Sequence, residues 1–269
     1  MNSAVSFFRS SIGRKLLMAV SGLILIGFIT GHLVGNLQIY SPADKINGYA
    51  EFLHSLGPTL WVVRVFLLFF AVIHIWSAIS LTRDNQKARG AVSKRYAINH
   101  TIRATLASRT MRISGFVVLA FVIYHLAQFT VGVADRTHFK ETLQPYTMQS
   151  DYHLFGITTV HKGEVVPDVQ SMMIYGFQQP LISVFYIIAI GLLSFHLIHG
   201  FDSAFQTLGI RNGKWSKGLR TFSIAFSVAY FVLNLTIPAW ILAGRVTLRP
   251  EVTAAASRGA SVAQLPAQR

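Results

Sequence analysis

Five apolar segments, each long enough to cross a bilayer, constrain the fold of this chain more than any other feature. They cover residues 15–38, 59–82, 112–133, 180–202 and 221–243. About 20 residues of helix cross a hydrocarbon core of roughly 30 Å. Hydrophobic residues make up 52% of the chain and charged residues 13%, which leaves too few polar side chains to coat a water-soluble globule of this size. The sequence therefore predicts an all-α membrane protein, a bundle of five transmembrane helices.

The remaining segments predict a simple organisation. We expect a single transmembrane domain over residues 1–244, followed by a polar, disordered tail over residues 245–269, where Ala, Ser, Arg and Gln prevail. The long polar segment of roughly residues 134–179 is expected to cap the outer face. Its His138, His153 and His161 are interpreted as solvated loop residues.

The basic residues predict the orientation in the membrane. Fifteen of the 24 Lys and Arg residues, but only two of the ten acidic residues, lie in the N-terminal segment and in the loops after the second and fourth spans. By the positive-inside rule, the N-terminus is cytoplasmic and the C-terminus lies outside, as in a multi-pass protein of the cytoplasmic (inner) membrane. Because the net charge of +14 is concentrated on one side of a lipid bilayer, it does not indicate a nucleic-acid partner. These fifteen bases are Arg9, Arg14, Lys15, Arg83, Lys87, Arg89, Lys94, Arg95, Arg103, Arg109, Arg112, Arg211, Lys214, Lys217 and Arg220.

The chain has no cysteine. This excludes disulfides, thiolate-bound iron–sulfur clusters and covalent c-type haem attachment within this chain. A haem held here would be bound non-covalently, through His or Met.

Four histidines inside the spans are the candidate ligands. With a helical rise of about 1.5 Å per residue, His32 and His125 lie about 25 Å and 20 Å from the cytoplasmic ends of their spans. His74 and His196 lie about 12 Å and 9 Å from those ends. A single histidine in a span is more often a packing residue or part of a proton path. Two depth-matched pairs on four helices instead predict two haems between facing helices, with each iron bound by two imidazoles.

Two imidazoles per iron leave no open coordination position, which suits electron transfer and not oxygen chemistry.

His199 is the alternative to His196 in the inner pair, but it lies only about 4.5 Å from the end of its span. Depth therefore favours His196. Small residues beside the candidate ligands would let a flat macrocycle approach a helix: Gly31, Gly35, Ala71, Ala78 and Gly200.

Arg64 is the charged residue that lies well inside a span, about 8 Å from its outer end. Its side chain could extend to the membrane interface. We favour a propionate of the outer haem as its partner, because a guanidinium binds a carboxylate through two parallel hydrogen bonds.

Several motifs resemble the cytochrome b subunit of succinate dehydrogenase and fumarate reductase, of the single-subunit, di-haem (b558/b556) type. The likeness covers roughly residues 10–242 in motif order, span count and loop placement. The motifs are SSIGRK at 10–15, MAVSGL at 18–23, GHLVGNL at 31–37, ASRTMR at 107–112, YHL at 124–126 and HLIHGFDSAFQTLG at 196–209.

The resemblance implies a membrane anchor of a complex that serves the tricarboxylic acid cycle. The anchor would pass electrons between an iron–sulfur subunit and a quinone through two b haems. FAD would reside in a flavoprotein subunit and the iron–sulfur clusters in the iron–sulfur subunit, both on the cytoplasmic face. It would therefore act as a non-flavin subunit of the enzyme, without activity on succinate by itself. The resemblance pairs His32 with His125 and His74 with His196, as depth does, and places the fourth ligand four residues before a glycine, as His196 stands before Gly200.

The same likeness implies menaquinone as the quinone and a glutamate as its proton donor. Glu51, in the short loop after the first span, is the candidate for this role, against the simpler interpretation of a solvated carboxylate.

Two other functions compete with this one. A di-haem anchor of a hydrogenase or formate dehydrogenase would share the histidine pairs, but the motif at 196–209 argues against it. A haem-free proton-coupled transporter would use the histidines as a relay, but relays usually include carboxylates, and no acidic residue lies in the middle of a span.

Overall fold

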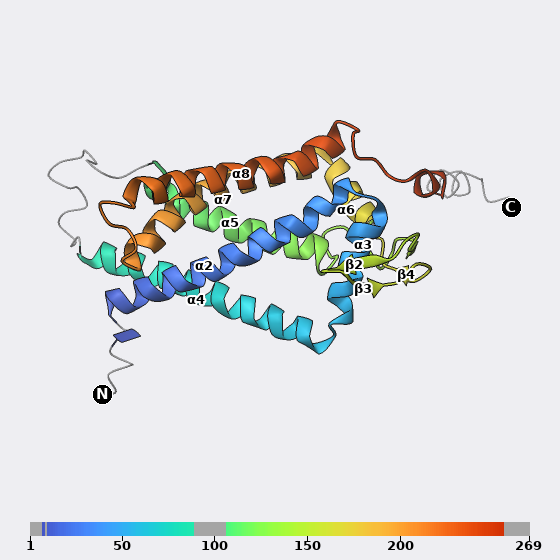
Figure 1. Ribbon diagram of the computed structural model, residues 1–269. Coiled ribbons are helices and arrows are strands. Elements are labelled where there is room, and N and C mark those ends of the chain that lie inside the picture. Colours follow the sequence, from blue (N-terminus) through green and yellow to red (C-terminus); the bar gives the residue numbers. More distant parts are fainter. Residues whose placement is uncertain (1–6, 9, 89–105, 256–269) are drawn as a thin grey trace. The chain divides into compact units, whose positions relative to one another are not determined.

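The computed structural model describes residues 7–8, 10–88 and 106–255, and Figure 1 shows the course of the chain. Long helices dominate the described residues, with four short strands between α5 and α6. The elements in chain order are α2 (Ser11–Asn36), η1 (Leu37–Tyr40), α3 (Ala43–Ser55), α4 (Pro58–Ala88), α5 (Leu106–Phe129), β1 (Tyr146–Thr147), β2 (Tyr152–Leu154), β3 (Ile157–Val160), β4 (Val165–Val166), α6 (Val169–Gln178), α7 (Pro180–Thr207) and α8 (Ser216–Leu242).

Five of these helices are long and apolar enough to cross a membrane. They are α2 with η1, α4, α5, α7 and α8, so the prediction of an all-α membrane protein with five spans is confirmed. At their C-terminal ends, two helices run further than the apolar pattern indicated. α4 continues past Arg83 to Ala88, and α7 continues past Asp202 to Thr207. The first charged residue marks the end of the apolar stretch, but backbone hydrogen bonding continues the helix beyond it.

Local sequence explains where the spans begin and end. Pro58 and Pro180 occupy the first positions of α4 and α7, where a missing N–H costs nothing. Beyond α7, Gly209 adopts a positive φ of 73°, and the N–H of Ile210 donates to the carbonyl of Phe205 at 3.0 Å. This pairing satisfies a carbonyl that the last helical turn leaves open.

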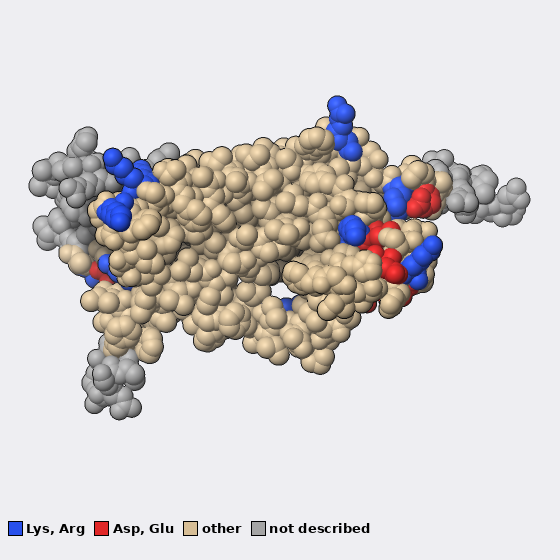
Figure 2. Space-filling model, in the orientation of Figure 1, with Lys and Arg blue, Asp and Glu red and all other residues tan. Residues whose placement is uncertain are grey.

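α4 presents apolar side chains outward along most of its length. Among its residues only Ser77 is buried, while Trp61, Phe66 and Phe69 are exposed. On the face shown in Figure 2, the middle parts of the long helices likewise form an almost uncharged surface, and Lys and Arg gather near helix ends. An exposed apolar surface of this extent suits lipid as the surrounding solvent.

The chain forms two compact units. The first contains Met1–Val34, Leu56–Leu119 and Ile190–Val232, and the second contains Gly35–Ser55, Ala120–Ala189 and Leu233–Arg269. Four of the five boundaries cut through continuous helices, namely α2, α5, α7 and α8, and the fifth falls between α3 and α4. The expectation of one domain over residues 1–244 stays a prediction.

Within the first unit, polar and aromatic contacts join neighbouring helices. Arg14 of α2 forms an ion pair with Asp84 of α4 at 2.5 Å and also hydrogen-bonds to Ser80. The ring of Phe201 in α7 meets the ring of Phe226 in α8 edge-on, with centroids 5.0 Å apart. These contacts position α4 against α2 and α8 against α7.

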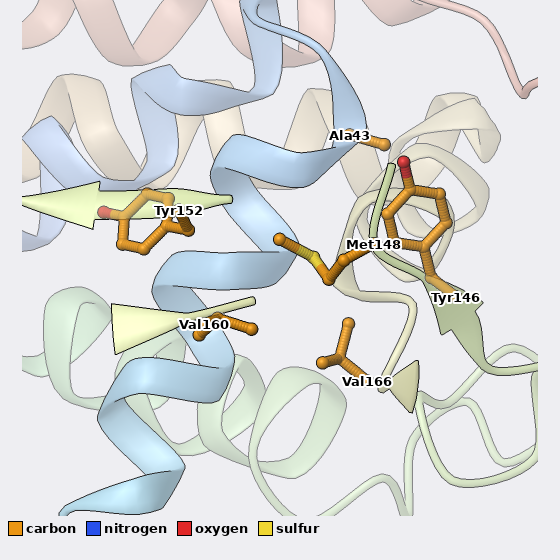
Figure 3. Packing of buried hydrophobic residues seen from close by; sticks show 6 residues of the cluster. All are labelled: Ala43, Tyr146, Met148, Tyr152, Val160 and Val166. Carbon is orange, nitrogen blue, oxygen red and sulfur yellow. The ribbon is translucent and has the colours of Figure 1, made fainter. Parts of the chain in front are cut away.

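The second unit contains a small folded region, here called the cap, made of α3, β1 to β4 and α6. β1 pairs with β4 and β2 with β3, both antiparallel. The two small sheets pack their apolar side chains against α3, as Figure 3 shows. Its core contains Ala43, Tyr146, Met148, Tyr152, Val160 and Val166. The expected polar loop of residues 134–179 therefore has strands, a helix and a core of its own, because alternate strand residues face α3.

One histidine of this region differs from the expectation of simple solvation. His138 is half-buried, pairs with Asp135 at 3.1 Å and stacks on the ring of Tyr175, with centroids 4.4 Å apart. His153 and His161 are exposed, as expected, although His153 also shares a hydrogen bond with Thr158 at 2.9 Å.

Asp44 stabilises the cap from inside. It is 5% exposed and accepts hydrogen bonds from the hydroxyl of Tyr146 at 2.9 Å and from the backbone N–H of Gln149 at 2.7 Å. Burial opposes ionisation of Asp44, but the hydrogen bonds outweigh it, so the pKa of this carboxyl lies below its ordinary value. Burial and the bond to Asp44 raise the pKa of Tyr146 to about 12.

The segment after α8 corrects the expectation of a wholly disordered tail. Arg249 forms an ion pair with Asp168 at 2.5 Å, hydrogen-bonds to Gln170 at 3.0 Å and stacks over the ring of Tyr146 at 4.6 Å. A helical turn follows at residues 250–255. The tail composition gave no sign of this anchor, because it depends on a buried carboxylate far away in the sequence. The rest of the tail, residues 256–269, lies outside the described residues.

Candidate metal centre

His74 of α4 and His196 of α7 face each other in the first unit. Their ring centroids lie 6.3 Å apart, and the ring planes differ by 61°. Both side chains are half-buried. The structure thus brings together the two residues that depth assigned to the inner pair.

The Nδ1 atom of His74 is bound by α2. It lies 3.2 Å from the backbone carbonyl of Met18 and 3.3 Å from the hydroxyl of Ser21. A carbonyl can only accept, and the Ser21 hydroxyl donates its own proton to the carbonyl of Leu17 at 2.7 Å. His74 must therefore carry its proton on Nδ1, which leaves a lone pair on Nε2.

His196 is held in the same way by α5. Its Nδ1 lies 3.4 Å from the hydroxyl of Ser114, and that hydroxyl donates to the carbonyl of Met111 at 3.1 Å. The proton of His196 again belongs on Nδ1. Within the part of the chain that the structure describes, the hydrogen bonds of both rings run through Nδ1, and both Nε2 lone pairs remain for another partner.

The spacing of the two rings fits a metal ion bound between them. An imidazole nitrogen binds a transition metal at about 2 Å, so two rings on opposite sides of one ion have centres about 6 Å apart. The observed 6.3 Å matches this arrangement. Metal-bound histidines also usually donate their other N–H to a carbonyl or hydroxyl, as both rings do here. The donor set and its spacing therefore fit a haem iron.

Three glycines lie near the pair, and at one of them a side chain would crowd a histidine ring. A Cβ on Gly22 would lie 3.1 Å from Cε1 of His74, and a Cβ on Gly115 would lie 3.8 Å from Cε1 of His196. A Cβ on Gly200 would meet nothing within 4 Å. Gly22 thus lets His74 approach α2, and Gly200 leaves open space one turn after His196.

His199, the alternative ligand, has a different environment. Its Nε2 shares a hydrogen bond of 3.0 Å with the hydroxyl of Ser203 on the same helix. His199 thus bonds through Nε2 to its own helix, whereas His74 and His196 bond through Nδ1 to neighbouring helices. This difference favours His196 as the partner of His74.

His125 lies in the second unit and repeats the pattern of the inner pair. Its Nδ1 lies 3.3 Å from the hydroxyl of Tyr186, which donates its proton to Oε1 of Gln128 at 2.8 Å. Nδ1 of His125 is then the donor. In His74, His196 and His125 alike, Nδ1 therefore donates to a hydroxyl oxygen whose own proton is donated to another acceptor.

His32 has an exposed side chain and stacks on Phe28, with ring centroids 5.6 Å apart. A Cβ on either Gly27 or Gly31 would meet nothing within 4 Å, so this part of α2 has room for a flat group. His32 and His125 belong to different units, and their pairing as ligands of an outer haem stays a prediction.

The two remaining candidate residues have their own surroundings. Arg64 places its guanidinium over the ring of Trp61, 4.9 Å from the ring centroid. Glu51 lies in α3 and not in a loop, and its side chain is half-buried. α3 forms here because its apolar residues pack on the strands of the cap, a contact that the local sequence does not reveal.

No group of three or more His, Asp or Glu side chains that could hold a metal ion occurs among the described residues. A site built from two imidazoles does not belong to this class.

Of the basic residues used for the orientation, Arg9, Arg89, Lys94, Arg95 and Arg103 lie outside the described residues.

Sequence reasoning missed the residues that orient the rings. Ser21 and Ser114 each precede the outer histidine of their own helix, His32 or His125, by eleven residues, which is close to three helical turns. α2 and α5 therefore each present a serine at the level of the inner pair and a histidine further out. This repeated spacing is the sequence signal that could have found them.

Comparisons with protein-family models, with curated proteins and with solved structures give no match.

Proposed function

We propose that this chain is the membrane anchor and electron-transfer subunit of a succinate:quinone oxidoreductase, and that it holds two b haems through four histidines. The observation that carries the proposal is the pair of His74 and His196, whose spacing and proton positions fit two ligands of one iron. The resemblance of the sequence motifs supports the choice of dehydrogenase.

A haem with two imidazole ligands supplies one-electron transfer without an open position for oxygen. The chain supplies the rest of the site. His74 and His196 present their Nε2 lone pairs, while Ser21 and Ser114 hold the rings in the required tautomer. Neutral partners on Nδ1 keep the ligands neutral, which avoids burying extra charge within the membrane.

The outer haem of the proposal uses His32 and His125. His125 has its Nδ1 on the Tyr186 hydroxyl, and His32 lies beside the open surface at Gly27 and Gly31. The depth of both residues along their spans supports this pairing.

The proposal places the chain in the cytoplasmic membrane with the N-terminus inside. On that side, the loop between α7 and α8 carries Arg211 and Lys214, and the start of α8 carries Lys217 and Arg220. Such a basic surface would dock an iron–sulfur subunit, which in turn contacts the flavoprotein with FAD. Such a complex could work either as a succinate dehydrogenase or, in reverse, as a fumarate reductase, and menaquinone is the proposed quinone.

Glu51 is the proposed proton donor to the quinone. Its half-buried carboxylate lies on α3, close in sequence to the end of the span that carries His32. Replacing Glu51 by Gln should abolish quinone turnover and leave both haems bound. Unaltered turnover would end this assignment.

Arg64 is the proposed partner of a propionate on the outer haem. Its guanidinium is already held over Trp61, which fixes its direction without neutralising its charge. Arg64→Leu should shift the potential of the outer haem in a redox titration. Identical potentials in the variant and the parent chain would speak against this contact.

The first experiment is a reduced-minus-oxidised optical spectrum of membranes that contain this chain, with haem quantified per polypeptide. We expect two b haems per chain. Alanine at His74 or at His196 should remove the same haem, alanine at His32 or at His125 should remove the other, and His199→Ala should keep both. A chain without b-type absorbance would refute the proposal.

A further inference from the structure

Tyr186 connects His125 to Gln128 inside the second unit. The Tyr186 side chain is 5% exposed, and its hydroxyl lies 2.8 Å from Oε1 of Gln128 and 3.3 Å from Nδ1 of His125. Gln128 is 2% exposed and lies on α5, one turn after His125. A buried chain of three polar groups thus crosses from α5 to α7 and back.

Aromatic rings hold Tyr186 in place. Phe121 and Phe177 meet its ring edge-on, each with centroids 5.0 Å apart. Phe129 and Phe185 complete the surround, at 6.1 Å and 6.0 Å. With rings on several sides, Tyr186 cannot swing its hydroxyl away without opening the packing, so the position of the hydroxyl is determined by the fold.

Gln128 is held equally tightly. A Cβ on Gly176 of α6 would lie 2.9 Å from Nε2 of Gln128, so α6 approaches the amide closely. Among the described residues, this buried Nε2 has no hydrogen-bond partner. Leaving a buried donor unpaired destabilises the fold. The amide nevertheless keeps Oε1 toward the Tyr186 hydroxyl.

The direction of the hydrogen bonds follows from this orientation. Oε1 of Gln128 only accepts, so Tyr186 donates to it and offers a lone pair to Nδ1–H of His125. We propose that Tyr186, oriented by Gln128, is a positioning residue that sets the tautomer and the donor strength of His125 and thereby the potential of the haem that His125 ligates. This inference rests on the proposed function.

The expected effect has a definite sign. A hydrogen bond from Nδ1–H makes an imidazole a better donor through Nε2, which favours ferric over ferrous iron. Removing the acceptor should therefore raise the potential of this haem. The potential depends on how much more tightly the histidine binds ferric than ferrous iron. If this ratio of affinities changes about tenfold, the potential shifts by about 59 mV for a one-electron couple.

The test is an optical redox titration of both haems in the full chain in membranes, with His125→Ala identifying the haem concerned. Tyr186→Phe keeps the ring and removes the hydroxyl, and should raise that potential by about 59 mV. Gln128→Glu places a stronger acceptor behind Tyr186 and should lower it. Tyr124→Phe is the matched control, because Tyr124 packs against Tyr186, with centroids 6.2 Å apart, and should change neither potential.

The outcomes separate this inference from the proposed function. If the parent chain holds no haem, the proposed function fails. If it holds two haems, and both Tyr186→Phe and Gln128→Glu leave both potentials unchanged, the role of Tyr186 is refuted while the function stands. Shifts of opposite sign, confined to the haem that His125→Ala removes, would support the inference.

Discussion

Two regions of the molecule bury polar side chains, and they do so in different ways. In the cap, Asp44 and Asp168 are 5% and 2% exposed, and each carboxylate is bound by donors of the chain itself. In the first unit, His74 and His196 are half-buried, and their hydrogen bonds within the described residues run through Nδ1. Each Nε2 therefore keeps a lone pair that can bind a proton donor or a metal ion.

The difference separates a structural site from a binding site. The carboxylates of the cap find their hydrogen-bond donors within the chain, so a role in stability is enough to explain why they are buried. The histidine pair instead keeps two ring nitrogens for a partner from outside the chain. The spacing of 6.3 Å between the ring centroids fits a metal ion as that partner.

The largest effect is expected from breaking the histidine pair. Replacing either His74 or His196 by Ala should remove one of the two proposed haems, because the proposed site needs both imidazoles. Haem quantification and the optical spectrum measure this. If both variants retained the haem content of the parent chain, the histidine pair would not be a binding site, and its difference from the carboxylates of the cap would disappear.

A smaller effect is expected at the anchor of the cap. Arg249→Ala leaves Asp168 buried without its cation and should destabilise the cap by about 3 kcal/mol. Hydrogen exchange of β1 to β4 should quicken accordingly, while the haem on His74 and His196 stays bound. Glu251→Ala is the control, since Glu251 is 67% exposed, and its loss should change little. Equal exchange in both variants would contradict a structural role for Arg249.

The pH dependence of the cap sharpens the comparison further. The pKa of Asp44 is lower in the folded state than in the unfolded state. The ionised carboxylate therefore stabilises the fold at a pH above the ordinary pKa of Asp, and this stabilisation is lost as the pH falls through the lowered pKa. Cap stability should therefore fall below about pH 4, and Asp44→Asn should remove this part of the dependence at a cost of about 1–2 kcal/mol near pH 7. Hydrogen exchange over a pH series measures both, and a variant with the parent's acid profile would exclude Asp44 as the source.

The smallest effect is expected at Gly22. Gly22→Ala adds a Cβ 3.1 Å from the His74 ring, which must then shift by a few tenths of an ångström, at a cost of about 1 kcal/mol. The inner haem should dissociate at a slightly lower temperature. Gly218→Ala adds the same methyl group to α8, where nothing lies within 4 Å, and should leave haem release unchanged. Matching release in both variants would show that α2 does not support His74 closely.

Sequence patterns predicted some features of the site and missed others for identifiable reasons. The depth of His74 and His196 along their spans follows from the constant rise of a helix, so their meeting could be predicted. The acceptors on Nδ1, Ser21 and Ser114, were missed because serines in apolar segments usually pack unremarkably against the helix backbone. Glu51 was expected in a loop, because the contacts that make α3 a helix come from strands about a hundred residues away.

The class of this protein and the number of its spans follow from apolar length and charge position alone, because lipid requires backbone hydrogen bonds to be satisfied within each segment. The folded structure was needed to show which ring nitrogens are bound, which carboxylates of the cap are satisfied, and that Arg249 binds Asp168. Those contacts join residues far apart in the chain, and their geometry depends on how packed elements place side chains within a few tenths of an ångström, which no local pattern encodes.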